Sequence, residues 1–413
     1  MITRVEAYRF RCLREIKQSL RPFQILVGPN ASGKSAFMDV LAFLSTLVSE
    51  GLQAAASERS QNFHDLVWGR GGYGFRLAVE AHPREPDDAG VKFPEHVTGE
   101  RAAGARSPSP PYAIDSGAVP SRKIRYEVEA HVDPETDQVS LTKERVEVEA
   151  PNSSGLVLIA WRDASEAHFT SEDGHLDQAL RLVGSDYSVL RLVPSTGADV
   201  PLKDALRNLL ADRIQRVLLD TKKLRNPSPP YYGRVDTVDG SQLPRWVNQL
   251  NEKSPQSFSD WLAHVQTALP DLEGIRVVLR PEDQHRYLML RYKNGVELPS
   301  WTVSEGTLRL LALTILAYMP EANRIFLIEE PENGVHPMAL DAIYQSLSSI
   351  YEGQVLIASH SPILLNLAKL EELLCFAKTD QGTEVIVGDQ HPVLMNWKGE
   401  VALSDLFVGG VLS

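Results

Sequence analysis

Apolar positions along the chain follow two spacings, which together predict a mixed α/β protein. Residues 23–27, 324–329 and 355–358 are almost entirely apolar and predict buried strands. Directly after the first of these runs, apolar residues recur at helical spacing, namely Phe37, Val40, Leu41, Leu44 and Leu47. Buried strands with adjoining amphipathic helices are typical of a sheet covered by helices on its faces.

A second set of segments alternates strictly between apolar and polar residues. Residues 1–6, 124–130 and 145–149 have this pattern, and residues 75–80 and 156–161 predict further strands. Alternation predicts antiparallel strands with one face in water. We therefore expect an antiparallel β segment beside the buried sheet.

The segment 175–270 is predicted to be mostly helical. One apolar stripe is formed by Leu202, Leu206, Leu209, Leu210, Ile214, Val217 and Leu218, with Asp212 four residues before Arg216. A second is formed by Phe258, Trp261, Leu262, Val265 and Leu269. Core packing is the favoured interpretation of both stripes, and a surface for a partner is the alternative.

Residues 81–123 interrupt these patterns with seven prolines, mixed charges and few large apolar side chains. Such a segment buries too little surface to offset its ordering entropy, so we expect a flexible surface insertion. The alternative is a phosphorylated or partner-binding segment. Two further boundaries, near residues 271 and 370, complete the predicted division into 1–80, 81–123, 124–174, 175–270, 271–370 and 371–413.

Composition limits the function classes. The net charge of −12 argues against a protein that coats nucleic acid by bulk electrostatics. It leaves open a local basic face, for which the candidates are Arg207, Arg213, Arg216, Lys222, Lys223, Arg225 and Arg234, although a solvated charged helix face is the favoured interpretation. The two cysteines, Cys12 and Cys375, form no disulfide framework. With no signal peptide and no apolar run of about 18 residues, we expect a cytoplasmic protein without a membrane span.

Residues 28–35 carry the first chemical signal. They are Gly28, Pro29, Asn30, Ala31, Ser32, Gly33, Lys34 and Ser35, and they fit G-x-x-x-x-G-K-[ST] between a predicted strand and a predicted helix. Glycines in such a loop turn backbone N–H groups toward phosphates, and the helix N-terminus adds its positive dipole end. We expect a nucleoside triphosphate, ATP, with Lys34 on the β/γ-phosphates and Ser35 on Mg²⁺.

The C-terminal half supplies acidic and imidazole groups at strand ends. Glu329 and Glu330 end one apolar run, which we expect to lie next to the loop strand, and His360 ends another. In a phosphate-loop ATPase the first carboxylate serves the metal, and the second accepts a proton from the attacking water. His360 is predicted to contact the γ-phosphate and report its presence. His336 is expected only to help position the turn after the carboxylates.

A third element precedes these strands. Ser304, Glu305 and Gly306 open an apolar helix, where a hydroxyl and free N–H groups favour an anion. We expect Ser304 and Gly306 to contact the γ-phosphate of an ATP molecule held by another chain. This arrangement predicts a homodimer or a higher homo-oligomer.

In this order, the four elements resemble the ABC-type ATPase heads of the SMC/RecF/OLD group, and most closely its stand-alone bacterial AAA-family ATP-binding proteins. The opening strand with Phe10, Arg11, Cys12 and Leu13 fits this resemblance, as do residues 328–337 and 358–362. The implied fold is an ABC-type P-loop NTPase head with a mixed central sheet and an antiparallel β subdomain, interrupted by a largely helical insertion. Glu329 stands where transporters and SMC heads have Asp, and Gln61 is a weak Q-loop candidate.

The resemblance implies a Mg²⁺-dependent ATP hydrolase that acts as a conformational switch. Genome defence against phage, with control of a separately encoded effector such as a nuclease, is the favoured role. A RecF-like DNA repair ATPase that binds nucleic acid directly is the second interpretation, and a transporter ATP-binding subunit is a remote third. Residues 406–412 form an apolar end, which is expected to dock on the ATPase or on a partner.

Overall fold

The computed structural model describes most of the chain. The described residues are 1–82, 122–149, 155–163, 166–170, 176–181, 186–192, 200–231, 237–319, 323–380, 382–395, 397 and 401–410. The insertion expected at 81–123 lies almost entirely outside these residues. Among the described helices, none is both long enough and apolar enough to cross a bilayer.

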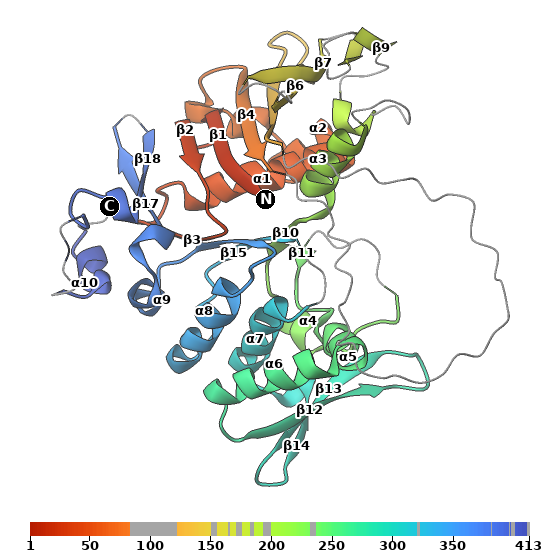
Figure 1. Ribbon diagram of the computed structural model, residues 1–413, viewed down its shortest axis with the longest axis vertical. Helices are drawn as coiled ribbons and strands as arrows, with labels where there is room; N and C mark the ends of the chain where they lie inside the picture. The colour runs from red at the N-terminus through yellow and green to blue at the C-terminus, as the bar shows by residue number, and fades with distance from the viewer. Residues whose placement is uncertain are drawn as a thin grey trace, which may run out of the picture.

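A seven-stranded sheet forms the centre of the molecule (Figure 1). Its order is β11 (Thr237–Val238), β10 (Ile214–Val217), β15 (Ile325–Glu329), β16 (Gln354–Ala358), β3 (Phe23–Val27), β17 (Leu373–Thr379) and β18 (Gly382–Val387). The first six strands are parallel, and β18 is antiparallel to β17. The predicted apolar runs are therefore parallel strands buried on both faces.

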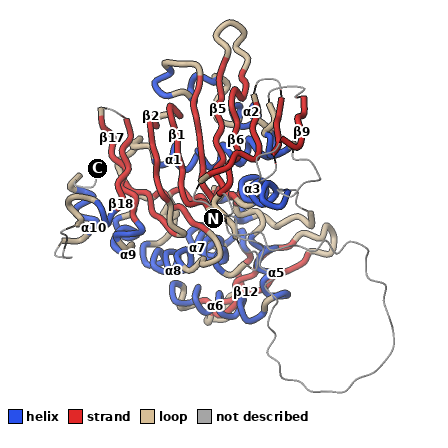
Figure 2. Tube along the Cα trace, turned by 45° about the horizontal axis from the view of Figure 1, so that its top comes forward, coloured by secondary structure: helices blue, strands red, loops and turns tan. Residues whose placement is uncertain are grey.

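An eight-stranded antiparallel sheet lies beside it (Figure 2). Its order is β2 (Leu13–Ser19), β1 (Ile2–Phe10), β4 (Gly74–Ala81), β5 (Ile124–Val132), β6 (Val139–Glu149), β7 (Leu156–Arg162), β8 (Glu166–Thr170) and β9 (Leu176–Arg181). In β5, buried and partly exposed residues alternate without interruption. The alternating segments of the sequence thus form the predicted one-faced strands.

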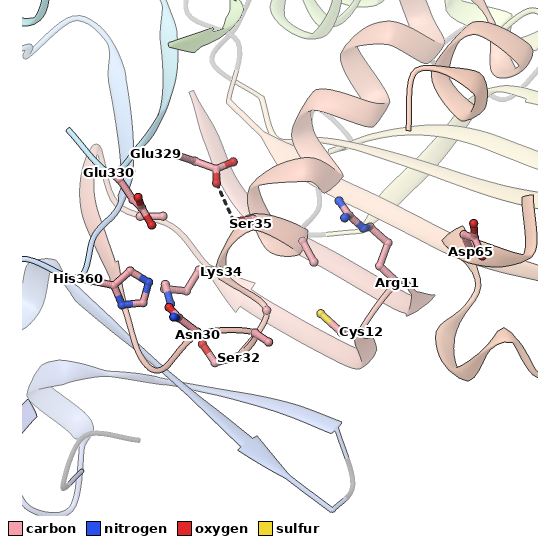
Figure 3. Close-up of a pocket in the computed structure, with 14 residues that line it drawn as sticks. Arg11, Cys12, Asn30, Ser32, Lys34, Ser35, Asp65, Glu329, Glu330 and His360 are labelled. Atoms are coloured by element: carbon pink, nitrogen blue, oxygen red, sulfur yellow. Dashed lines mark hydrogen bonds between the residues drawn. The ribbon is translucent and has the colours of Figure 1, made fainter. Parts of the chain in front are cut away.

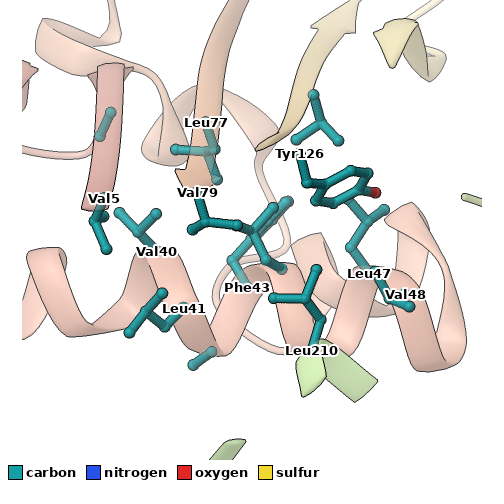
Figure 4. Close-up of a cluster of buried hydrophobic side chains, with 14 of the residues drawn as sticks. Val5, Val40, Leu41, Phe43, Leu47, Val48, Leu77, Val79, Tyr126 and Leu210 are labelled. Atoms are coloured by element: carbon teal, nitrogen blue, oxygen red, sulfur yellow. The ribbon is translucent and has the colours of Figure 1, made fainter. Parts of the chain in front are cut away.

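Helix α1 (Lys34–Glu50) fills the space between the two sheets (Figures 1 and 4). Its Val40, Phe43 and Leu47 are fully buried, and they face Leu77 and Tyr126 of the antiparallel sheet. Helices α2 (Leu52–Ser57) and α3 (Val200–Asp212) extend this layer. The antiparallel sheet therefore holds the helix that begins at the glycine loop.

The opposite face of the central sheet is covered by a second hydrophobic core. Its helices α7 (Glu305–Thr314), α8 (Leu340–Ser348) and α9 (Pro362–Leu367) pack on Ile25, Ile328 and Ile357, whereas Leu26, Leu327 and Leu356 face the α1 side. Alternate residues of each central strand thus serve two separate cores.

A smaller lobe continues this second core, below the sheet in Figure 1. It contains α4 (Thr221–Arg225), α5 (Leu243–Lys253), α6 (Pro255–Ala268) and a three-stranded sheet of β12 (Leu272–Leu279), β13 (Arg286–Tyr292) and β14 (Glu297–Pro299). Trp261 and Val265 of the second predicted stripe are fully buried there. Core packing, the favoured interpretation of that stripe, fits its position.

The first predicted stripe is wrong beyond residue 212. Helix α3 ends at Asp212, and Ile214 and Val217 belong to strand β10, which pairs with β15. Asp212 and Arg216 therefore do not share a helix. Short apolar runs do not distinguish strand from helix by periodicity, and here pairing with the central sheet decides. The segment 175–270 consequently supplies two strands to the central sheet as well as helices.

The C-terminal segment is also integrated into the fold. Strand β17 pairs with β3, and α10 (Leu403–Val408) follows the hairpin formed by β17 and β18. Leu403 is buried in the second core, and the backbone N–H of Ser404 donates to Asn366 of α9 at 3.0 Å. Over its described residues, the apolar end of the sequence thus docks on the second core and on α9.

Thr314 is predicted to hold the small lobe to helix α7. Its hydroxyl accepts a hydrogen bond from the fully buried indole N–H of Trp261 at 3.0 Å. Thr314→Val leaves that N–H unsatisfied and is expected to lower the free energy of unfolding by about 1–3 kcal/mol in urea titrations. Thr267→Val, at an exposed position of α6, is the matched control and should change stability by less than about 0.5 kcal/mol. Equal effects of the two variants would contradict this role.

Candidate nucleotide-binding site

The glycine loop is formed by close packing against the C-terminal hairpin. Gly28 and Gly33 have φ values of 148° and 106°. A Cβ atom at Gly28 would lie 2.2 Å from the carbonyl oxygen of Phe376 in β17, and one at Gly33 would lie 2.7 Å from Thr383 Oγ1 in β18. Only glycine fits both the backbone conformation and the space at these positions.

Lys34 and Ser35 begin helix α1 and face two carboxylates. The ammonium group of Lys34 donates to the carbonyl oxygens of Gly28 at 2.7 Å and Pro29 at 2.9 Å. Burial lowers the pKa of Lys34 to about 8, although Glu330 and Glu329 oppose this shift. Ser35 Oγ donates to Glu329 Oε2 at 2.7 Å. This hydroxyl–carboxylate pair is a suitable ligand set for Mg²⁺, which prefers oxygen.

Glu329 is the last residue of strand β15 and Glu330 follows it, at the edge of the sheet where the glycine loop also lies. The expectation that β15 is next to β3 is wrong, because β16 lies between them. A motif identifies the end of a strand but not its neighbours in the sheet. Because all three strands are parallel, their carboxyl ends still meet at one edge.

The backbone of Glu330 has an unusual conformation. Its φ is 47°, in the left-handed region, and its N–H donates to the carbonyl of Ala358 at 2.8 Å. The side chain of Asn333 donates to the Glu330 carboxylate. Such backbone strain in a residue other than glycine occurs most often at functional sites.

A third carboxylate, Glu332, joins the two strand ends. Its Oε1 accepts hydrogen bonds from Ser359 Oγ and from the backbone N–H of His360, both at 2.8 Å. Sequence reasoning gave Glu332 no role. Its place in the Glu-Glu-Pro-Glu run was the available signal, and its buried partner Ser359, which follows β16, could not be inferred from spacing.

These residues surround one cavity of about 620 Å³ (Figure 3). Of the predicted site residues, it is lined by Asn30, Ala31, Ser32, Gly33, Lys34, Ser35, Glu329, Glu330 and His360. Gly28 and Pro29 take part through the carbonyl groups that bind Lys34. The cavity is also lined by residues that no sequence pattern assigned to the site, namely Arg11, Cys12, Ala36, Asp65 and Ala358.

Ser304 and Gly306 lie elsewhere. They line a separate cavity of about 350 Å³ together with Thr307, His336 and Met338. Ser304 caps helix α7, and its Oγ accepts a hydrogen bond from the N–H of Thr307 at 3.2 Å. Neither residue is among those lining the cavity of the glycine loop. The structure therefore separates the two predicted phosphate contacts of this single chain.

Helix α7 is attached to neighbouring elements of its own chain through Glu305 and Gly306. Glu305 Oε1 accepts hydrogen bonds from Thr221 Oγ1 at 2.5 Å and Arg309 Nε at 2.8 Å, and these contacts lower the pKa of Glu305. A Cβ atom at Gly306 would lie 2.7 Å from the carbonyl oxygen of Gly334. The helix thus packs on the turn that follows Glu330.

The loop is chemically suited to a polyphosphate. The hydroxyl of Ser32 is buried and has no hydrogen-bond partner among the described residues, although Ser32 lines the cavity. A buried donor without a partner is costly unless a ligand satisfies it. Ser32, the Lys34 ammonium and the start of α1 are all suited to an anion, and the Ser35–Glu329 pair is suited to its metal. The residues therefore fit ATP with Mg²⁺.

Comparison with known proteins identifies the class. Residues 106–366, more than half of the chain, match the family described as "AAA domain, putative AbiEii toxin, Type IV TA system". The chain belongs to this family. The matched range contains Ser304, Glu330 and His360 and begins after the glycine loop. No curated protein matches the chain.

Solved structures with a similar fold are SMC heads. The structure of "the SmcHead bound to the C-winged helix domain of ScpA" has a TM-score of 0.52 at 14% identity and covers 93% of this chain and 97% of that one. A Pyrococcus furiosus Smc head bound to the C-terminal domain of ScpA has a TM-score of 0.48 at 11% identity, covering 93% and 95%. The Thermotoga maritima SMC head has a TM-score of 0.44 at 10% identity, covering 94% and 98%. The chain thus has the fold of an SMC-type ABC ATPase head, as predicted, and its family is described as an AAA domain.

Glu332 is predicted to position His360. Glu332→Ala removes the acceptor of the His360 N–H and is expected to lower kcat about 10²-fold, because small displacements at a reacting centre are costly. The affinity for ATP, measured by calorimetry, should remain near that of the wild type. Glu332→Gln keeps an acceptor and should restore most of the activity, and Glu252→Ala, at an exposed position of α5, serves as the control. Wild-type turnover in Glu332→Ala would refute this role.

Proposed function

We propose that the protein is a Mg²⁺-dependent ATP hydrolase that works as a head-to-tail dimer around two ATP molecules. One observation carries the proposal. A single cavity joins the glycine loop, the Ser35–Glu329 pair and the strand ends with Glu330 and His360, whereas Ser304 and Gly306 line another cavity. A second chain is needed to bring the two halves together.

Each residue of the first cavity has a distinct task in this proposal. Lys34 and the loop bind the phosphates, and Ser35 and Glu329 hold Mg²⁺, which supplies positive charge for the transferred phosphoryl group. Glu330 accepts a proton from the attacking water at a carboxylate oxygen, with Asn333 fixing its orientation. His360 donates a hydrogen bond to the γ-phosphate, and Glu332 holds its backbone in place.

The second chain contributes Ser304 and Gly306 in this proposal. Their helix packs through Gly306 on the turn after Glu330 of its own chain, and Glu305 accepts a hydrogen bond from Thr221 at the start of α4. Closure around ATP therefore connects the two sites, and hydrolysis opens the dimer. The product of the cycle is a conformational change.

We further propose a role in defence against phage, with the switch acting on a separately encoded effector. The family description names a toxin and a toxin–antitoxin system, and two similar SMC heads are bound to domains of ScpA. Both support a protein partner.

The candidate basic face offers weaker support for direct DNA binding. Three of its side chains form ion pairs within the chain: Arg207 with Asp204, Arg216 with Glu58 and Lys223 with Asp239. Co-purification with the product of a neighbouring gene, and DNA binding with and without ATP, separate the two roles.

Glu330→Gln is predicted to bind ATP and trap the dimer. Without the proton acceptor, turnover should fall about 10²–10⁴-fold, while ATP still closes the interface. Size-exclusion chromatography with light scattering should show a dimer that depends on ATP. Lys34→Ala is the control and should lose ATP binding in calorimetry. Normal hydrolysis by Glu330→Gln would show that the proton acceptor is another residue.

Mixing two inactive variants tests whether the site is composite. One chain carries Glu330→Gln and the other Ser304→Arg, so each homodimer is defective at both sites. In the mixed dimer both substitutions fall in one site, and the other site is intact. Mixing should therefore recover up to about half of the wild-type turnover per mixed dimer. If activity does not return although mixed dimers form, Ser304 does not act across an interface.

A further inference from the structure

The cavity of the glycine loop extends beyond the residues suited to phosphate. In Figure 3, Glu330, His360 and Lys34 lie at one end, and Arg11, Cys12 and Asp65 lie at the other, with Ser35 between them. Its volume of about 620 Å³ lies within the range of roughly 300–1,000 Å³ typical of sites for whole small molecules. If the triphosphate lies at Lys34, Glu330 and His360 as proposed, the end that contains Asp65 is left for the nucleoside.

The turn between β1 and β2 forms one wall of that end. Arg11 has a φ of 52°, and its N–H donates to the carbonyl of Leu66 at 2.8 Å. Its guanidinium pairs with Asp39 at 2.7 Å, and Asp39 is also held by Arg59 at 2.7 Å. The turn is thus fixed both to helix α1 and to the segment that carries Asp65.

Asp65 lies in a short 3₁₀ turn, Phe63–Leu66, which is anchored by its two apolar ends. Phe63 and Leu66 are both buried. The carboxylate is oriented by two donors, Ser60 Oγ at 2.7 Å on Oδ2 and Arg70 Nη2 at 2.8 Å on Oδ1. An ionised carboxylate has about four acceptor positions, so it keeps capacity for two further donors.

We propose that Asp65 recognises the ribose of the bound nucleotide by accepting hydrogen bonds from its 2′- and 3′-hydroxyls. The inference rests on the proposed function, because that function places the phosphates at Lys34. The two hydroxyls are adjacent donors, and a carboxylate accepts from both. An acidic residue plays the same part toward ribose in dinucleotide-binding folds. Asp65 then selects ribonucleotides and fixes the orientation of the nucleoside.

Ligand analogues test this contact directly. Binding of ATP, 2′-deoxy-ATP and 2′,3′-dideoxy-ATP to the full chain with Mg²⁺ is measured by calorimetry. The wild type should prefer ATP over the dideoxy analogue by about 10- to 100-fold, since hydrogen bonds to charged groups are the stronger ones. Asp65→Ala should lower the affinity for ATP to that for the dideoxy analogue and leave the latter unchanged. Asp65→Asn, which keeps one acceptor, should give an intermediate preference.

Controls separate the possible failures. Asp260→Ala, at an exposed position of α6 where the carboxylate also accepts a side-chain hydrogen bond, should retain the full preference for ATP. Thermal unfolding shows whether Asp65→Ala is folded, and Asp65→Asn replaces it if it is not. A wild-type preference that persists without Asp65, or equal losses for all three ligands, overturns the inference. GTP is measured in the same way. If Asp65→Ala changes the preference for ATP over GTP but not the preference for ATP over its deoxy analogues, the ribose assignment is wrong. If the wild type binds none of the nucleotides, the proposed function fails.

Discussion

The hydrogen bond between Ser35 and Glu329 joins residues 294 positions apart in the sequence, and the rest of the site depends on it. Ser35 starts the helix after β3, whereas Glu329 ends β15, with β16 between the two strands. The bond can form only if these three strands are parallel and in register at their carboxyl ends. The described segments between residues 50 and 323 must therefore fold without displacing the carboxyl ends of these three strands.

Part of the chain between these residues meets this constraint by pairing with the central sheet. Strands β10 and β11 extend the parallel sheet beyond β15, and the antiparallel sheet packs on the other side of α1. The C-terminal hairpin closes the opposite edge, where Phe376 and Thr383 contact Gly28 and Gly33. The glycine loop is thus held between α1 and a hairpin that lies about 350 residues later in the chain, so the two ends of the sequence shape one loop.

The chemical groups of the site could be predicted from the sequence more completely than the order of the strands that hold them. Residues 28–35, Glu329, Glu330 and His360 were predictable because each ends or follows an apolar run, and all of them except Gly28 and Pro29 line one cavity. The order of strands was not predictable, since β-pairing is decided by tertiary contacts. Strand β10 was assigned to a helix for the same reason. Glu332 and Asp65 were missed because single polar residues carry no periodic signal, and only contacts to Ser359, His360, Ser60 and Arg70 reveal them.

The position of helix α7 follows from its packing on the turn after Glu330. Gly306 lies so close to Gly334 that no side chain fits, and Gly334 follows directly after Asn333, which orients Glu330. A shift of the N-terminus of α7 therefore moves the turn that follows Glu330 as well. In a dimer of the proposed kind, a chain that contacts its partner's ATP through Ser304 adjusts its own Glu330 at the same time. Two ATP sites connected through such short rigid contacts would change state together, which is the property that a molecular switch requires.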